Sequence, residues 1–255
     1  MSEVFIFGSA CGFPVPRLGH SSALLAALDK MLLIDAGEPC SRSLIETGRA
    51  IDSIDAILLT HGHSDHIGGL PMLIQSMWIL GRQKPLTLFL PAELVEPLKN
   101  WLDAIYIGPD FLQFELNLVP WESKPNFDVC GVRVRPLETT HLNSLTRRFG
   151  NGRFKAYSLR LECANFRILF SGDLGSPTDL EDQMNIPLDL LITEVAHFPP
   201  GELFQFLRDK TVRKIVLTHL ALELYGNEDA LLAEARGALP EANITVATDG
   251  MRIAI

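Results

Sequence analysis

The sequence predicts a mixed α/β protein made of two β-rich halves that both contribute residues to one site. Segments with a strand pattern and segments with a helix pattern alternate through both halves of the chain. Histidine and aspartate residues follow several strand-like runs, where loops from neighbouring strands can meet at one edge of a sheet. With 255 residues and 47% hydrophobic content, the chain can bury one large core, and we expect a single domain over 1–255.

The expected elements follow from apolar runs and from turn residues. Strand-like runs in the first half lie at 3–8, 22–28, 31–36 and 54–60. Helical patterns follow, each with a proline in its first turn, at 71–81 and 91–105. Strand-like runs in the second half lie near 132–137, 156–162, 166–171, 188–193 and 214–218, and helical patterns lie near 201–209 and 228–238. The Asp-Gly pair at 249–250 predicts a hairpin over 244–253.

A metal-binding cluster directly follows the run at 54–60. Three imidazoles and one carboxylate lie within six positions, at His61, His63, Asp65 and His66, although the chain has only seven histidines. Neutral imidazole nitrogens with a carboxylate oxygen suit zinc or a similar metal. His61 and His63 are two residues apart and can point the same way, whereas Asp65 and His66 can reach a second ion. We therefore interpret this loop as a metal site rather than as a polar loop rich in histidine.

Three later residues stand in matching positions and supply the missing ligands. His141, Asp173 and His219 each lie just beyond a strand-like run. One such residue alone is more often structural, but together with the first cluster they predict a site for two ions. One ion would be held by His61, His63 and His141, the other by Asp65, His66 and His219, with Asp173 as the bridge.

At these seven positions the chain resembles the metallo-β-lactamase-fold hydrolases, whose motif HxHxDH is followed by His, Asp and His. Residues 8–14, GSACGFP, and residues 32–38, LLIDAGE, are similar to the opening of ribonuclease Z and its phosphodiesterase relatives. The resemblance implies a four-layer αββα sandwich with the site at the edge between two sheets. Two divalent ions are expected, with zinc as the first choice and manganese or iron as alternatives.

Catalytic roles follow from two metals and from the resemblance. Two dications lower the pKa of a shared water toward neutrality, so a serine or cysteine nucleophile is not needed. Asp65 can accept the proton of that water, a role that the resemblance also implies. Asp35 either orients the histidine loop or simply forms a turn before Gly37. Ribonuclease Z enzymes carry His-Glu-Ala-Thr before the final ligand; here Glu194 matches, and His197 could serve as the general acid.

The substrate is expected to be a small phosphodiester. A net charge of −9 argues against a general nucleic-acid binder. Only 31 residues separate His141 from Asp173, which leaves no room for the long arm with which the tRNA-processing enzymes hold tRNA. A basic segment at Arg147, Arg148 and Arg153 is either a solvated hairpin or a loop that holds phosphate.

Several alternatives stay open. The same metals would serve a lactonase, an ester or thioester hydrolase or a β-lactamase, and a tRNA 3′-endonuclease or a non-catalytic metal sensor is less favoured. RNA remains a candidate substrate beside small hydrolysable compounds, and a homodimer is also left open. The four cysteines lack zinc-ribbon spacing and suggest reduced thiols. The sequence shows neither a signal peptide nor a membrane span, so we expect a cytoplasmic protein.

Overall fold

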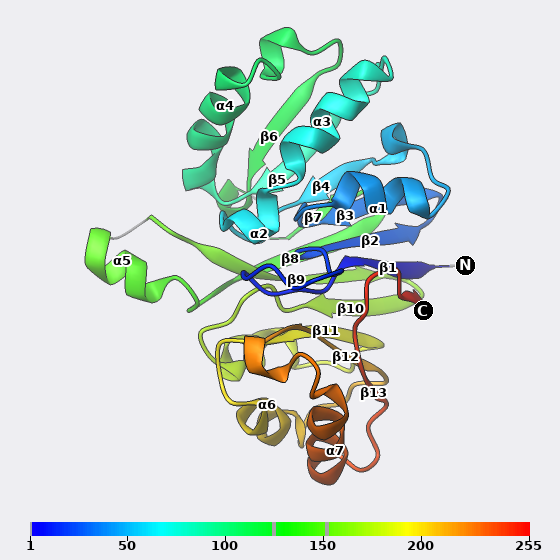
Figure 1. Ribbon diagram of the computed structural model, residues 1–255, viewed down its shortest axis with the longest axis vertical. Coiled ribbons are helices and arrows are strands. Elements are labelled where there is room, and N and C mark those ends of the chain that lie inside the picture. The colour runs from blue at the N-terminus through cyan, green and yellow to red at the C-terminus, as the bar shows by residue number, and fades with distance from the viewer. Residues whose placement is uncertain (1, 124–125, 151–152) are drawn as a thin grey trace.

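The structure, a computed structural model, describes residues 2–123, 126–150 and 153–255. Within this part of the chain two seven-stranded sheets pack face to face, which confirms the expected α/β fold (Figure 1). The first sheet contains, in spatial order, β14 (Arg252–Ala254), β1 (Glu3–Gly8), β2 (Ser22–Ala27), β3 (Lys30–Ile34), β4 (Ala56–Leu58), β5 (Leu86–Leu90) and β6 (Leu116–Pro120). The second contains β13 (Ile244–Val246), β12 (Ile215–Leu220), β11 (Leu190–Val195), β10 (Phe166–Phe170), β9 (Ala156–Cys163), β8 (Val132–Thr139) and β7 (Phe127–Val129).

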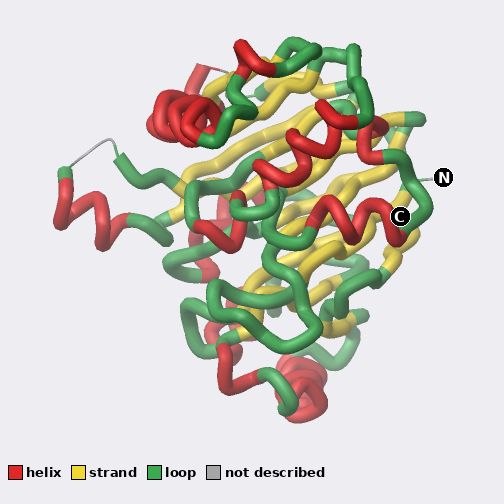
Figure 2. The backbone as a smooth tube through the Cα atoms, turned by 45° about the horizontal axis from the view of Figure 1, so that its top comes forward, coloured by secondary structure: helices red, strands yellow, loops and turns green. Residues whose placement is uncertain are grey.

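Helices cover the outer faces of the sheets, so the layers run helix, sheet, sheet, helix (Figure 1). The first sheet is covered by α1 (Cys40–Glu46), α3 (Leu70–Ile79) and α4 (Val95–Ala104), and the second by α6 (Pro200–Leu207) and α7 (Glu228–Ala238). The short α2 (Ser64–Ile67) lies at one end of the first sheet. By contrast, α5 (Asn143–Phe149) projects from the side of the layers in both views (Figures 1 and 2).

The main apolar core lies between the two sheets, because both inner faces carry apolar side chains. Leu58 in β4 and Leu159 in β9 are fully buried there. Every residue of β4 and β11 is buried, since these strands are covered on both faces and therefore consist of nearly unbroken apolar runs. Two further apolar clusters lie under the helices, with Leu73 of α3 in one and Phe204 of α6 in the other.

Parallel pairing brings the site residues to one edge of the sandwich. In the first sheet β3, β4 and β5 are parallel neighbours, and in the second β10, β11 and β12 are. Asp35 and His61 follow strands of the first sheet, and Asp173 follows β10 of the second. Glu194 and His219 lie near the ends of β11 and β12. The expectation that the residues follow strands is confirmed for His61 and Asp173, whereas Glu194, expected in a loop, and His219, expected just beyond its strand, lie inside β11 and β12.

Most expected strands and helices exist with small shifts at their ends, but the terminal hairpin was wrong. β13 pairs in parallel with β12 in the second sheet, whereas β14 pairs antiparallel with β1 in the first. The Asp-Gly turn therefore lies where the chain crosses between sheets. Gly250 has a φ of 79° and donates its N–H to the carbonyl of Ile6 at 2.8 Å. Each of the two strands thus pairs with a strand that is distant in the sequence, whereas a hairpin requires them to pair with each other.

Of the two alternatives for the basic segment, the hairpin was wrong for residues 147–149, which belong to α5. Arg147 and Arg148 lie in the last turn of α5, and Arg153 lies beyond it. Residues 151 and 152, part of the expected turn, lie outside the described residues. The sequence analysis also missed α1, β5, β6 and β7. In the described chain, no helix is long and apolar enough to cross a lipid bilayer.

Candidate metal centre

Asp35 anchors the loop that carries the first histidines. It follows β3 with a φ of 55°, and its carboxylate accepts the Thr60 N–H at 2.7 Å and the Thr60 hydroxyl at 2.8 Å. The same carboxylate lies 2.7 Å from Nδ1 of His66. This contact fixes the ring so that Nε2 faces the site. Its link to His61 runs through Thr60, whose hydroxyl is 3.1 Å from Nδ1 of His61.

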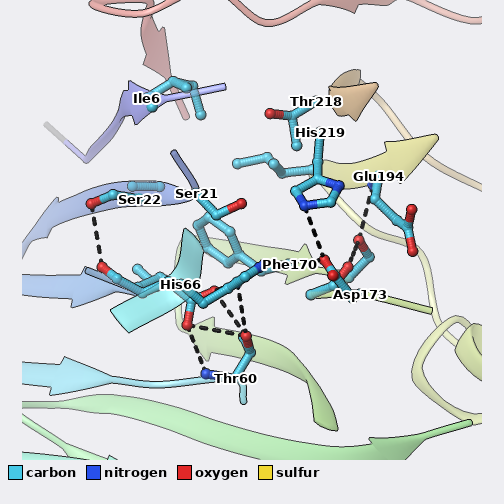
Figure 3. A pocket seen from close by; sticks show the side chains of 17 residues that line it. Ile6, Ser21, Ser22, Thr60, His66, Phe170, Asp173, Glu194, Thr218 and His219 are labelled. Atoms are coloured by element: carbon cyan, nitrogen blue, oxygen red, sulfur yellow. Dashed lines mark hydrogen bonds and ion pairs between the residues drawn. The ribbon is translucent and has the colours of Figure 1, made fainter. Parts of the chain in front are cut away.

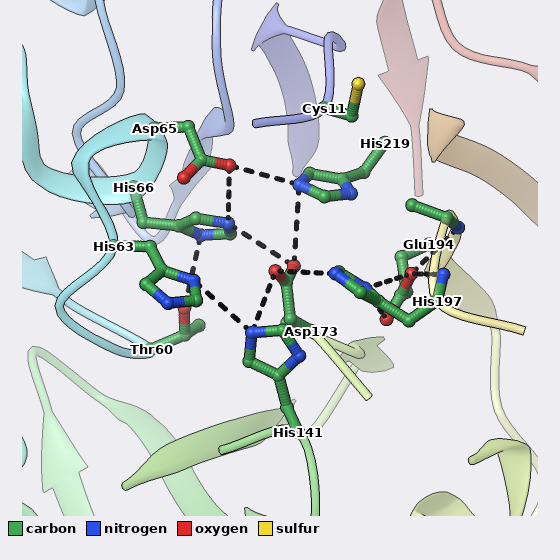
Figure 4. A network of polar contacts seen from close by, with 12 residues as sticks. Cys11, Thr60, His63, Asp65, His66, His141, Asp173, Glu194, His197 and His219 are labelled. Atoms are coloured by element: carbon green, nitrogen blue, oxygen red, sulfur yellow. Dashed lines mark hydrogen bonds and ion pairs between the residues drawn. The ribbon is translucent and has the colours of Figure 1, made fainter. Parts of the chain in front are cut away.

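Four side chains form the first group, namely His61, His63, His141 and Asp173. Figure 4 labels the last three of them. Nε2 of His61 lies 3.6 Å from Oδ2 of Asp173, and Nε2 of His141 lies 3.5 Å from the same oxygen. Nε2 of His141 is also 3.3 Å from Nδ1 of His63. The loops after β4, β8 and β10 thus bring their polar side chains to one point.

The second group consists of Asp65 and His66 from α2 and His219 from β12. Oδ2 of Asp65 lies 3.1 Å from Nε2 of His219 and 3.4 Å from Nε2 of His66. Oδ1 of Asp173 lies 3.3 Å from Nε2 of His66 and 3.6 Å from Nε2 of His219. Asp173 therefore turns one carboxylate oxygen toward each group, as a ligand shared by two ions would.

Both groups fit a divalent metal ion in spacing and in chemistry. Donor atoms 3.1 to 3.6 Å apart match the separation of about 3.3 Å between tetrahedral ligands placed 2.0–2.1 Å from zinc. Nε2 of His61 and Nε2 of His66 are buried and have no hydrogen-bond partner among the described residues. Buried polar atoms are normally bonded, so these nitrogens are suited to bind a cation. Imidazole and carboxylate are also the donors that zinc-class ions prefer.

In the first group the directions of the pKa shifts favour metal binding as well, whereas in the second group burial is outweighed by the carboxylates around His66 and His219, which raise the pKa of these two imidazoles. Burial, followed by the neighbouring His66, lowers the pKa of His61 well below its usual value. Burial likewise lowers the pKa of His141 to about 4. Burial opposes the charge of Asp173, but the imidazoles of His219, His66 and His61 outweigh it and hold the pKa of this carboxyl well below its usual range. Neutral imidazole and ionised carboxylate are the forms that bind metal.

His197 and Glu194 lie together beside the first group. Nδ1 of His197 is 2.9 Å from the buried Glu194 carboxylate, which also accepts the backbone N–H of His197 at 3.1 Å. Burial lowers the pKa of His197, but the hydrogen bond to Glu194 outweighs it, so the pKa is raised. Nε2 of His197 lies 4.0 Å from Oδ2 of Asp173. His197 also forms a ligand-spaced group with Asp173 and His219, so the geometry suits either an acid or a ligand.

A cleft of about 660 Å³ opens beside the first group and is bounded on one side by α5. Its lining includes the candidate site residues His63, His141, His197 and Arg147. The other two arginines expected to contact phosphate lie over aromatic rings. The guanidinium of Arg148 is 5.0 Å and that of Arg153 is 5.2 Å from the centre of a neighbouring phenylalanine ring. The structure thus brings Arg147 to the cleft and turns Arg148 and Arg153 toward their own neighbours.

A smaller cavity of about 60 Å³ lies behind the metal-ligand candidates, between the two sheets (Figure 3). His66, Asp173 and His219 form part of its wall. The remaining wall includes hydroxyl side chains, namely Ser21, Ser22, Thr60, Ser171 and Thr218. The candidate ligands are therefore backed by polar groups rather than by the apolar core alone.

Thr60 and Gly172 contribute to the site although the sequence analysis did not single them out. Thr60 joins Asp35 to the first histidine. Gly172 precedes Asp173 with a φ of 56°, and a Cβ at this position would lie 2.5 Å from the carbonyl oxygen of Tyr157. Only glycine fits this close approach. Their position in the sequence could have indicated both residues, because each directly precedes a candidate ligand.

Comparisons with known proteins agree with this geometry. A protein-family model described as Anti-Pycsar protein Apyc1 matches residues 2–230. The chain is 28% identical over 199 residues to a ribonuclease Z of Metallosphaera sedula, a match that covers 76% of this chain and 65% of that protein. Less than two thirds of that relative is therefore matched. A ribonuclease Z of Methanosarcina acetivorans is 26% identical, over 100% of this chain and 98% of that protein.

Solved structures show the same fold. The metallo-β-lactamase-fold protein YhfI of Bacillus subtilis superposes with a TM-score of 0.81 at 20% identity, over 100% of both chains. A diphosphatase from the PhnP family superposes with a TM-score of 0.72 at 19% identity, over 100% of this chain and 98% of that one. Sheet order, ligand groups and relatives all support a metal-dependent hydrolase of this fold. The chain belongs to the family described as Anti-Pycsar protein Apyc1, in the ribonuclease Z-like branch of the metallo-β-lactamase fold.

Proposed function

We propose that the protein hydrolyses small phosphodiesters, linear or cyclic, at a centre for two divalent ions, with zinc as the first candidate. The observation that carries this proposal is the orientation of Asp173, whose two carboxylate oxygens face separate groups of imidazoles. The proposed ligands are His61, His63, Asp65, His66, His141, Asp173 and His219. The names of the relatives, ribonuclease Z and a diphosphatase, support phosphate ester chemistry.

The chain's own residues can handle the protons of such a hydrolysis. When bound, two ions would supply Lewis acidity, a water of lowered pKa and charge for the phosphoryl oxygens. Asp65 lies in the second group and is the proposed acceptor for the proton of the attacking water. On the other side, His197 is held by Glu194 and is 35% exposed toward solvent. We assign to His197 the donation of a proton to the leaving oxygen.

The small size of the substrate is inferred from the segment between His141 and Asp173. Its 31 residues form α5, β9 and β10, so little chain is left for a tRNA-binding arm. The chain has a net charge of −9, and Arg147 is the arginine that lines the cleft. Binding of a long nucleic acid relies on many basic contacts to phosphates. We therefore favour a substrate that fits within the cleft over precursor tRNA.

A substrate panel tests this proposal. The metal-reconstituted protein should hydrolyse bis(p-nitrophenyl) phosphate faster than a homoserine lactone or nitrocefin, and should process the 3′ end of precursor tRNA poorly. Asp173→Asn should lose both ions and the activity together. Asp189→Asn is a matched control, because its carboxylate instead accepts the backbone N–H of Arg167 at 2.9 Å. Preferred hydrolysis of the lactone, or efficient cleavage of precursor tRNA, would contradict the proposed substrate class.

A further inference from the structure

His219 stands at a β-bulge of the second sheet. The parallel pairing of β11 and β12 shifts register between Thr218 and Leu220, so His219 is an extra residue in its strand. Its φ of 47° belongs to the left-handed region that residues with a side chain rarely adopt. Bulges next to active sites re-aim side chains. Here the bulge residue carries the imidazole of the second group, so the position of this ligand depends on how the bulge is held.

A single backbone contact from the other sheet holds this bulge. The His219 N–H donates to the carbonyl oxygen of Ser9 at 3.0 Å. Ser9 follows β1 of the first sheet, whereas His219 belongs to β12 of the second. An extra residue in a bulge is left unpaired by its own ladder, so this bond satisfies a donor that would otherwise lack a partner. The location of Ser9 therefore sets the backbone of His219.

Two side chains near the C-terminal end of the chain hold the Ser9 loop. The hydroxyl of Tyr225 donates to the Ser9 carbonyl at 3.3 Å and accepts the N–H of Cys11 at 3.0 Å and of Leu220 at 3.2 Å. Cys11, two residues after Ser9, and Leu220, the last residue of β12, are thus tied to one oxygen. All three bonding positions of that hydroxyl are used.

Asp249 holds the same loop from its other side. One carboxylate oxygen accepts the Ser9 N–H at 2.9 Å and the Ser9 hydroxyl at 2.8 Å. The other oxygen accepts the N–H of Gly19 at 2.6 Å. A carboxylate that accepts three hydrogen bonds forms strong, charge-assisted contacts. Ser9 is therefore fixed on its amide side by Asp249 and on its carbonyl side by Tyr225.

We propose that Tyr225 and Asp249 are positioning residues for the second metal ion, and act through Ser9 on the bulge at His219. This inference rests on the proposed two-ion centre and adds residues outside its ligand set. Asp35 and Thr60 support one ligand of each group, His66 and His61, whereas the contacts of Tyr225 and Asp249 lead through Ser9 to His219 of the second group. Loss of either positioning residue should therefore weaken one ion and spare the other.

Zinc titration of the full chain against a chromogenic chelator tests this separation. Tyr225→Phe and Asp249→Asn keep the shape of each side chain. The first removes the hydroxyl that contacts the Ser9 loop, and the second removes the charge and one of the two acceptor oxygens. We expect one binding step, that of the second group, to lose about tenfold or more in affinity, a usual effect of removing partners that orient metal ligands. The other step should be unchanged. His219→Ala assigns the affected step to the second group, because it removes the ligand itself.

Tyr157→Phe is the matched control. The Tyr157 hydroxyl also makes a hydrogen bond within the fold, to Glu122 at 2.9 Å, but Ser9 and His219 are not its partners. It should lower the melting temperature to a similar extent without changing either binding step. Equal zinc affinity of Tyr225→Phe and the unaltered protein would overturn the inference alone. Equal weakening of both binding steps would also overturn it, because the two residues would then stabilise the fold in general. Failure of the unaltered protein to bind zinc would overturn the proposed centre as well.

Discussion

The contact between His197 and Glu194 holds the residue to which we assign protonation of the leaving group. A buried carboxylate holds Nδ1 of the imidazole and raises its pKa, while Nε2 points toward Asp173 (Figure 4). His197→Ala should therefore slow the hydrolysis of aryl phosphodiesters, and the loss should grow as the pKa of the leaving phenol rises. The loss should be small for p-nitrophenol and roughly 10²-fold for poor leaving groups, the usual contribution of a general acid. The slope of log kcat against leaving-group pKa measures this.

His20→Ala is the matched control for that measurement. His20 is half-buried, and its Nδ1 contacts the carbonyl oxygen of Cys11 at 2.9 Å. Its removal should leave the slope unchanged. If His197→Ala instead lowers kcat equally for all substrates and releases a metal ion, His197 is a metal ligand and not the general acid.

At the residue scale, the sequence could predict which side chains come together at the candidate metal site, but not which contacts fix their positions. The spacing of His61, His63 and His66 in one loop indicated a metal site, and later ligands were recognisable because each follows a strand-like run. Tyr225 and Asp249 carried no such signal. Their partner Ser9 lies more than 200 positions away in the chain, and only the packed fold brings them together.

Among the elements, α5 is the one to which the proposed function gives a contact with the substrate. It borders the cleft, and each of its residues is exposed or half-buried. Arg147 lines the cleft, whereas Arg148 lies over an aromatic ring. Arg147→Ala should raise KM for bis(p-nitrophenyl) phosphate about two- to fivefold, because an accessible charge pair contributes up to about 1 kcal/mol. Arg148→Ala in the same helix should have little effect.

Steady-state kinetics with a neutral ester as second substrate separates charge from shape. KM for the neutral ester should stay constant in the Arg147 variant. An equal rise in KM for both substrates would indicate that α5 shapes the cleft without contacting phosphate. Reversal of all three arginines to Glu should raise KM for the diester more than for the neutral ester, because it replaces positive charge near the cleft with negative charge.

Two of the elements that were not expected from the sequence carry weak local patterns. α5 has too few apolar residues for a helical stripe, and the glycine after it suggested a turn between strands. β7 spans only Phe127–Val129 and is held by antiparallel pairing with β8. A buried apolar run was recognised at β11 but not at β5, whose five residues are also largely buried.

For the whole molecule, stability depends on the apolar layer between the sheets. Leu159 is fully buried in this layer, whereas Leu222 is 51% exposed. Leu159→Ala should lower the free energy of unfolding by about 2–5 kcal/mol, because it leaves a cavity in a packed core. Leu222→Ala should change it by less than about 0.5 kcal/mol. Urea denaturation of the two variants checks this, and similar losses would mean that the core relaxes around the missing side chain.

The order of strands across the molecule was harder to predict than the strands themselves. The Asp-Gly pair at 249–250 is a strong local hairpin signal, yet the strands on either side join different sheets. Asp249 instead binds Ser9 and Gly19. A turn preference is a local property, whereas the choice of strand partner depends on the packing of the whole sandwich.

The pairing of β1 with β14 has a consequence for synthesis on the ribosome. Residues 3–8 are synthesised long before residues 252–254, which pair with one side of β1 while β2 pairs with the other. During that interval the nascent chain carries an open sheet edge. Such an edge can recruit the wrong strand. A chaperone that covers the free side of β1 until β14 has been made would therefore protect the chain.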